Sequence, residues 1–308
     1  MLQTFHELNS AFPWLIPCFL FVFGTIIGSF LNVCILRVPR GESIVSPRSH
    51  CACGAPIAWY DNIPILSWIL LRGRARCCGR PFSIRYPAIE ALTGLLFTAC
   101  WLLLPPSQAV CGLVFVSCLV CATFIDLDHM VIPNGLTLGL AVSGVLLSIL
   151  FPQLHGDASG IYIIDAFRSA MSSVLGVLIG SGLVLWIALA AEAVLKKEAM
   201  GFGDVKFVGA MGAFIGWQGT VTAIFGGALI GTVWFALAFP LSKLLHKSPE
   251  KLLKAESAEG QPTELCFGAQ VPYGPMLAIA GAVHFLFLHA YVNAYFHHLA
   301  VLFSSTGS

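Results

Sequence analysis

Charged residues are scarce in this chain: Asp, Glu, Lys and Arg make up 10% of its 308 residues, against roughly 25% in an ordinary soluble domain. This shortage, together with 57% hydrophobic residues and a mean hydropathy of +0.86, indicates a membrane protein with several spans. The net charge of +1 gives no reason to expect a nucleic acid partner. The first apolar run has no small-residue cleavage site after it, so we expect this run to be an anchor.

Apolar runs of about 20 residues predict an all-α polytopic fold with about eight transmembrane helices. A long loop at 37–87, with four cysteines, follows the first of these runs. We therefore predict a first transmembrane helix at 1–36, a cytoplasmic loop domain at 37–87 and a larger transmembrane domain at 88–308. The expected spans are 14–36, 88–105, 107–125, 133–151, 167–195, 207–217, 219–242 and 272–303.

The distribution of positive charge predicts the orientation of these spans. The loops at 37–87, 126–132, 196–206 and 243–271 carry 15 of the 16 Lys and Arg residues, and the exception is Arg168. Loops rich in Lys and Arg stay in the cytoplasm, so we expect these four loops on the cytoplasmic side and the bilayer as the surroundings of the chain.

The span at 207–217 is short, because 11 residues extend only about 16 Å across a core of roughly 30 Å. A re-entrant segment at this place would move the lysines of the next loop outside, against the charge rule. We therefore predict a short span, whose glycines allow neighbouring helices to approach closely.

Two aspartates, Asp126 and Asp204, lie where predicted spans meet water on the cytoplasmic side. Ionisable groups at membrane depth are costly and usually functional. Two carboxylates a few ångströms apart do not both ionise easily, so the pair holds one proton and supplies both a base and an acid for peptide hydrolysis. Gly201 and Gly203 leave room for an extended substrate beside Asp204. Lys206 either biases the local charge or anchors its helix at the interface.

Other interpretations of the aspartates stay open at this point. Each one alone is also typical of a helix cap, and Asp128 and Asn134 compete with Asp126 for that role. A transporter that relays protons or binds a cation would also use two carboxylates among several spans. Transporter carboxylates usually lie near the membrane midplane between internal repeats, and we find no such repeat in the sequence.

The cysteines of the 37–87 loop form two close pairs, Cys51 with Cys53 and Cys77 with Cys78. In the reducing cytoplasm such pairs are more often metal ligands than disulfides, and a tetrahedral zinc site would stabilise a loop too small to fold alone. The spacing argues against zinc, because paired ligands usually stand two to four residues apart and here the gaps are one and zero. A structural zinc ion and a loop that packs without metal both remain possible interpretations.

An ordered set of short motifs covers nearly the whole chain: Gly28–Val33, Arg40–Ser43, Trp59–Pro64, Arg85–Pro87, Ile125–Asp126, Ile132–Asn134, Glu198–Lys206 and Tyr273–Pro275. The Gly-x-Gly-Asp within the seventh motif is weak alone, but the ordered set is specific. Through these motifs the chain resembles the bacterial type IV prepilin peptidases, which are bifunctional leader peptidases and N-methyltransferases. The loop departs from many members, which carry two Cys-x-x-Cys pairs: the first pair is shortened by one residue, Ala75 replaces a cysteine of the second, and Cys77 is extra.

The resemblance implies that Asp126 and Asp204 are the catalytic pair of a transmembrane peptidase domain at 88–308. Asp126 is preferred over Asp128 because the family's aspartate stands seven residues before the proline, here Pro133. The implied substrates are type IV prepilins or type II secretion pseudopilins, whose basic leader is cut at the cytoplasmic face of the bacterial inner membrane.

The resemblance also implies N-methylation of the new amino terminus, with S-adenosylmethionine as the methyl donor and the loop domain associated with this activity. No glycine-rich nucleotide loop in the sequence supports the donor independently. A related Gly-x-Gly-Asp peptidase with another substrate would keep the two aspartates but would lack a cysteine-bearing loop.

Overall fold

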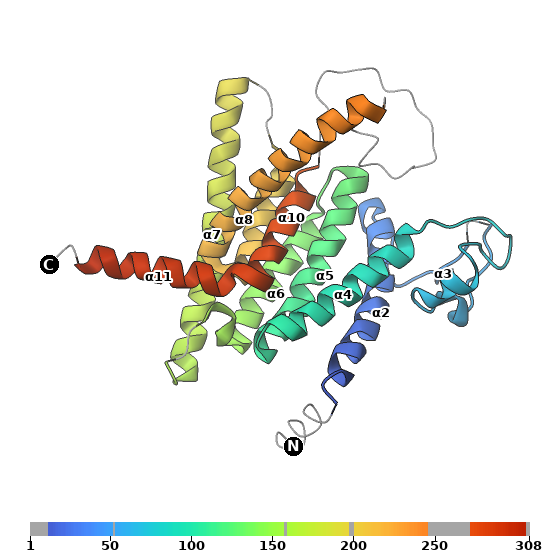
Figure 1. The fold of residues 1–308 in the computed structure, drawn as a ribbon, viewed down its shortest axis with the longest axis horizontal. Coiled ribbons are helices and arrows are strands. Elements are labelled where there is room, and N and C mark those ends of the chain that lie inside the picture. The colour runs from blue at the N-terminus through green and yellow to red at the C-terminus, as the bar shows by residue number, and fades with distance from the viewer. Residues whose placement is uncertain (1–11, 52, 157–158, 197–199, 246–271, 306–308) are drawn as a thin grey trace. The chain divides into compact units, whose positions relative to one another are not determined.

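The computed structural model describes residues 12–51, 53–156, 159–196, 200–245 and 272–305 (Figure 1). These residues are largely helical and contain no β-strand, only two isolated bridges in the loop, between His50 and Pro56 and between Arg74 and Pro81. The predicted all-α fold is therefore confirmed. Most of the expected loop at 243–271 lies outside the described residues. The chain divides into two compact units, one through Cys121 and the other from Ala122.

Among the described residues, six helices are long and apolar enough to cross a membrane, as a polytopic fold requires. The helix α6 (Asn134–Leu150) is also apolar but has only 17 residues. The six are α2 (Leu15–Arg37), α4 (Arg85–Leu103), α5 (Pro106–His129), α7 (Tyr162–Leu195), α8 (Phe202–Leu245) and the run formed by α10 (Gly274–Val283), the π-helical turn η4 (His284–Leu288) and α11 (His289–Ser305).

In the first unit, α2 packs closely against α4. A Cβ added at Gly28 would lie 2.7 Å from the Cα of Glu90, so only glycine lets the two backbones approach this far. The Glu90 carboxylate accepts the backbone N–H of Ile65 at 2.7 Å, which ties the loop between these helices to α4. The described part of the loop holds three short helical segments: η1 (Val38–Arg40), η2 (Trp59–Asn62) and α3 (Leu66–Leu70).

In the second unit, α7 and α8 make the most extensive contact. Glycines line it: a Cβ at Gly212 would collide with the Gly176 carbonyl, and a Cβ at Gly209 would collide with the Ser181 hydroxyl. The predicted close helix approach at this glycine-rich segment is therefore confirmed. The short segment η3 (Pro152–His155) connects α6 to the residues before α7 and packs against α7.

The helix α8 folds back on itself at Gly216, the one residue inside it with non-helical backbone angles (φ 67°, ψ 179°). The hydroxyl of Tyr273 donates to the Ile224 carbonyl at 3.3 Å, and the same side chain interacts electrostatically with Asp204. A straight helix would separate residues 204 and 224 by about 30 Å. The two arms, 202–215 and 217–245, therefore correspond to the expected spans 207–217 and 219–242. The number of spans stays approximate, since the six candidates include α8 only once.

Candidate active site

Asp126 lies in the last turns of α5, and its side chain is 6% exposed. Its Oδ2 accepts the backbone N–H of Gly274 at 3.0 Å, a contact between residues 148 positions apart. Gly274 is the first residue of α10, and the free N–H groups at a helix start favour negative charge. Asp126 therefore does not lie at a helix start, and its carboxylate binds α10, not the helix that follows it in the sequence.

Asp204 lies in the first turn of α8, and its own N–H donates to the Gly201 carbonyl at 3.1 Å. Ile132, which is 4% exposed, connects this turn to Asp126. A Cβ at Gly203 would lie 3.6 Å from the Cβ of Ile132, and one at Gly274 would lie 3.3 Å from its Cδ1. The two aspartates also interact electrostatically. The structure thus brings together Asp126 and Asp204, which the sequence predicts to share a site.

The predicted supporting residues take different places around Asp204. A Cβ at Gly201 would lie 3.9 Å from Oδ2 of Asp204, so both Gly201 and Gly203 keep this turn free of side chains. Lys206 donates from Nζ to Oδ1 of Asn134 at 2.8 Å and lies 4.6 Å from the centre of the Phe202 ring. These contacts favour the anchoring role of Lys206, because they join the start of α8 to the start of α6.

Sequence reasoning did not include Gly274 or Tyr273 among the site residues. Both belong to the motif Tyr273–Pro275, which was the available signal, but only the tertiary fold shows that this motif meets Asp126. Burial, together with the nearby carboxylate of Asp204, raises the pKa of the Tyr273 phenol. Tyr273 and Gly274 therefore belong to the candidate site together with the two aspartates.

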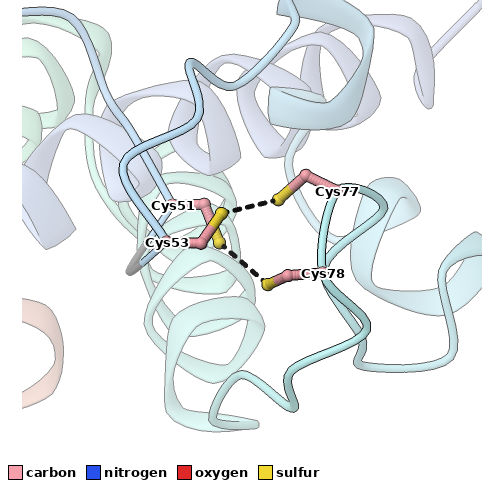
Figure 2. Close-up of side chains that lie close together, drawn as sticks. All are labelled: Cys51, Cys53, Cys77 and Cys78. Atoms are coloured by element: carbon pink, nitrogen blue, oxygen red, sulfur yellow. Dashed lines mark hydrogen bonds between the residues drawn. The ribbon is translucent and has the colours of Figure 1, made fainter.

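The four loop cysteines point toward one another from two separate turns (Figure 2). The sulfur atoms of Cys51 and Cys78 are 3.6 Å apart and those of Cys53 and Cys77 are 3.4 Å apart. All four sulfurs lie within 4.8 Å of one another. A tetrahedral zinc ion with Zn–S bonds of about 2.3 Å requires sulfur separations of about 3.8 Å, so these donors fit the ion in number and spacing.

The local backbone explains how such short cysteine gaps produce a cluster. Gly54 and Gly79 each follow a cysteine pair and adopt the left-handed conformation, with φ of 86° and 69°. The Gly79 N–H donates to the Ala75 carbonyl at 2.8 Å, which closes the second turn. A backbone hydrogen bond from Cys53, together with the neighbouring thiols, lowers the pKa of Cys51 to about 7, which favours the thiolate form that binds zinc.

Two family models match the chain. The model of the Bacterial Peptidase A24 N-terminal domain matches residues 22–104, and that of the Type IV leader peptidase family matches residues 113–236. The first match includes the four loop cysteines, and the second includes both aspartates. The chain belongs to the type IV leader peptidase family. The resemblance seen in the sequence is thereby confirmed.

Curated members of the type IV leader peptidase family match much of the chain. A prepilin leader peptidase/N-methyltransferase of Aeromonas hydrophila is 34% identical over 307 residues, which cover 91% of this chain and 93% of that protein. The protein of the same name from Klebsiella pneumoniae is 38% identical, over 69% of this chain and 90% of its own length. That of Myxococcus xanthus is 42% identical, over 76% of this chain and 64% of its own length. No solved structure gives a significant match.

Proposed function

We propose that this protein removes the basic leader of type IV prepilins or type II secretion pseudopilins at the cytoplasmic face of the bacterial inner membrane, with Asp126 and Asp204 as its catalytic pair. The observation that carries the proposal is the convergence of these two carboxylates, one of them bound to the Gly274 N–H at the start of α10. The names of the curated relatives support the substrate class.

The hydrogen bond to Asp126 suggests a division of roles. An N–H donor at a helix start stabilises a negative charge, so we assign Asp126 as the ionised base and Asp204 as the protonated acid. Asp126 takes a proton from water as the oxygen attacks the scissile carbonyl carbon, and Asp204 gives its proton to the carbonyl oxygen. When the carbon–nitrogen bond breaks, Asp126 passes its proton to the leaving amine and Asp204 recovers its own.

The position of the pair suits a substrate with a basic leader followed by an apolar helix. The charged leader stays in water and the apolar helix stays in the bilayer, so the cut falls at the boundary between them. Asp126 lies near one end of α5 and Asp204 near one end of α8. A pair at the end of its spans meets such a boundary without moving charge into lipid. The glycines beside Asp204 leave room for an unwound segment of substrate.

We also propose that the new amino terminus is N-methylated, as the names of the relatives indicate for those proteins. S-adenosylmethionine, the implied donor, would supply a methyl group bound to a positive sulfur. Among the described residues we find no glycine-rich loop at a helix start that fits its nucleoside, so we assign no residue to the donor.

The cysteine cluster, we propose, holds a structural zinc ion through all four thiolates. A closed site of four sulfurs leaves no position for substrate or water, so the ion would stabilise the loop and take no part in hydrolysis. Its contribution would be to hold the turn of Cys51 and Cys53 against the turn of Cys77 and Cys78.

Cleavage of a full-length prepilin in reconstituted membranes tests the proposed pair. We expect Asp126→Asn and Asp204→Asn each to lower the cleavage rate by at least about 10²-fold, because each removes one proton transfer and leaves the shape unchanged. Asp128→Asn is the matched control, since it makes the same change two residues along α5 and should retain activity.

The outcomes separate the candidate functions. Retained cleavage by either of the first two variants, with folding verified, would overturn the assignment of the pair. If the natural chain cleaves no prepilin, the transporter interpretation is preferred, and proton or cation uptake into the same vesicles measures it directly.

A further inference from the structure

The short helix α3, in the loop at 37–87, exposes an apolar face. Leu66, Ile69 and Leu70 stand three and four residues apart, so they lie on one side of the helix, and they are 48%, 57% and 71% exposed. We call these three side chains the α3 face. The polar side chain of the helix points inward, because the buried Ser67 hydroxyl donates to the carbonyl of residue 60 at 3.2 Å. A helix on a surface that meets water has the opposite arrangement.

Two contacts give the depth of α3 relative to the membrane helices. The Ile65 N–H, next to the start of α3, donates to the carboxylate of Glu90, which lies five residues into α4. A Cβ at Gly28 of α2 would meet the backbone of the same residue, and both Gly28 and Glu90 lie inside the expected spans 14–36 and 88–105. Helical side chains tilt toward the start of their helix, so the Ile65 N–H lies beside the first turns of α4. The helix α3 therefore begins at the boundary of the hydrocarbon core.

This depth makes the bilayer the expected neighbour of the α3 face. Lipid surrounds a membrane helix such as α4 where it enters the hydrocarbon core, and a protein partner of α3 would first have to displace that lipid. Interfacial helices bury their apolar face about 5–10 Å into the region where headgroups meet acyl chains. Trp59, which is 81% exposed in η2, is of a residue type enriched at the same level.

The charge beside α3 favours anionic lipid. The loop at 37–87 contains eight arginines, no lysine and two acids, and one of the acids, Asp61, already pairs with Arg76 at 2.8 Å. Arg72 and Arg74 follow directly after α3, and both are exposed. A guanidinium group binds phosphate through two parallel hydrogen bonds, and each basic residue near a membrane surface strengthens binding to anionic lipid by about fivefold. The same arginines would repel a basic peptide.

We propose that α3 is an interfacial helix, whose α3 face inserts into the leaflet where α4 begins and whose neighbours Arg72 and Arg74 bind the phosphates of anionic lipids. The inference does not depend on the proposed peptidase activity. It has a consequence for the loop, because the Phe82 N–H donates to the Gly73 carbonyl at 2.9 Å and closes the hairpin that carries the second cysteine pair. An inserted α3 would hold this hairpin, and the cysteine cluster with it, at the membrane surface.

Photo-crosslinking to lipid tests the insertion. The full-length chain carries a photoreactive amino acid at Leu70 and is reconstituted in vesicles of phosphatidylglycerol and phosphatidylcholine. Val45 is the matched control, since it is an apolar loop residue 85% exposed, and Arg37 at the end of α2 binds the carbonyls two residues before and after it. Arg37 lies about 13 Å along α2 beyond Gly28. Leu95, which is 60% exposed within α4, is the positive control.

We expect positions 70 and 95 to capture lipid in similar yield, and position 45 to capture at least about 10-fold less. The same photoreactive group at Ile69 repeats the test, so the result does not depend on the folding of one variant. If neither 69 nor 70 captures lipid while 95 does, or if 45 captures as much as 70, the insertion is wrong. Capture of a protein instead of lipid at position 70 in native membranes would also overturn the proposal.

The ratio of the two captured lipids tests the role of the arginines. With the photoreactive group at position 70, Arg72→Gln combined with Arg74→Gln should lower the ratio of phosphatidylglycerol to phosphatidylcholine at least about fivefold. Arg48→Gln is the control, since it removes an exposed arginine of the same loop close to Val45 and should leave the ratio unchanged. An unchanged ratio in the double variant, or an equal fall in the control, would show that these two arginines do not bind the lipid phosphates.

Discussion

The carboxylate of Asp126 depends on a backbone group, the N–H of Gly274, and not on a side chain. Any residue except proline supplies an N–H, but only glycine supplies one here without a collision. A Cβ at Gly274 would lie 2.5 Å from Oδ2 of Asp126 and 3.1 Å from its Cγ. The glycine therefore sets how closely α10 approaches the carboxylate that we assign as the base.

Gly274→Ala should displace the Asp126 carboxylate and lower the rate of prepilin cleavage by about 10²-fold, because displacements of about 1 Å at a catalytic group have effects of this size. The measurement is kcat in reconstituted membranes. Gly139→Ala is the control, since a Cβ at Gly139, within α6, meets no atom within 4 Å. Full activity in Gly274→Ala would show that this contact does not position the carboxylate.

At the level of single residues, the sequence predicted the two aspartates of the site but not the contacts that position the site residues. Asp126 and Asp204 could be selected because carboxylates at the ends of apolar spans are rare and costly. The role of Gly274 could not be selected, because it arises from a contact across 148 residues between a side chain and a backbone group. Lys206 was predicted with two alternatives, and only the position of Asn134 favours anchoring.

Among the elements, α8 shows how one residue changes the course of a helix. The apolar run continues through Gly216, and the sequence predicts two spans there, 207–217 and 219–242. The conformation of Gly216, with φ of 67° and ψ of 179°, is essentially restricted to glycine and makes the fold-back possible. Hydropathy located the division near residue 218, but the direction of the second arm required the contacts of Tyr273.

In the cysteine loop, the spacing of the cysteines in the sequence was a poor predictor of the metal site. The conformation of the two turns explains the cluster better. Gaps of one and zero residues argue against a zinc site when each pair is considered alone. The left-handed turns at Gly54 and Gly79 let sulfurs from two turns converge to within 4.8 Å. Predicting this geometry requires the fold of the whole loop, including the anchor between Ile65 and Glu90.

We expect the purified protein to contain about one equivalent of zinc, and both Cys51→Ser and Cys78→Ser to lose it, because each removes one of four ligands. Cys18→Ser is the control, since Cys18 is exposed and lies outside the cluster. Metal analysis gives the zinc content. Trypsin digestion gives a second readout, since a loop without its metal should be cut faster at its arginines. Less than half an equivalent in the natural chain, unchanged by both cluster variants, would contradict the zinc proposal.

For the whole molecule, the main physical constraint is the distribution of charge about the membrane. Fifteen of the 16 Lys and Arg residues lie in the loops that we expect on the cytoplasmic side. The turn of Asp204 and the loop of the cysteine cluster belong to this set, so we expect both proposed sites on the cytoplasmic side. We expect the segment around Arg168, near the start of α7, on the opposite side.

Thiol labelling from each side of the membrane tests this orientation. Val45→Cys adds a thiol at a position 85% exposed in the cysteine loop, and Ile161→Cys adds one at a position 56% exposed just before α7. Neither changes the charge, so neither alters the orientation signal. A reagent that does not cross membranes should label the thiol at 45 only in inverted vesicles and the thiol at 161 only in intact cells, each beyond the signal of the parent chain. The reverse pattern would place the cysteine loop outside. Labelling of both positions from the same side would mean that the number of spans between them is even, whereas the predicted number is odd.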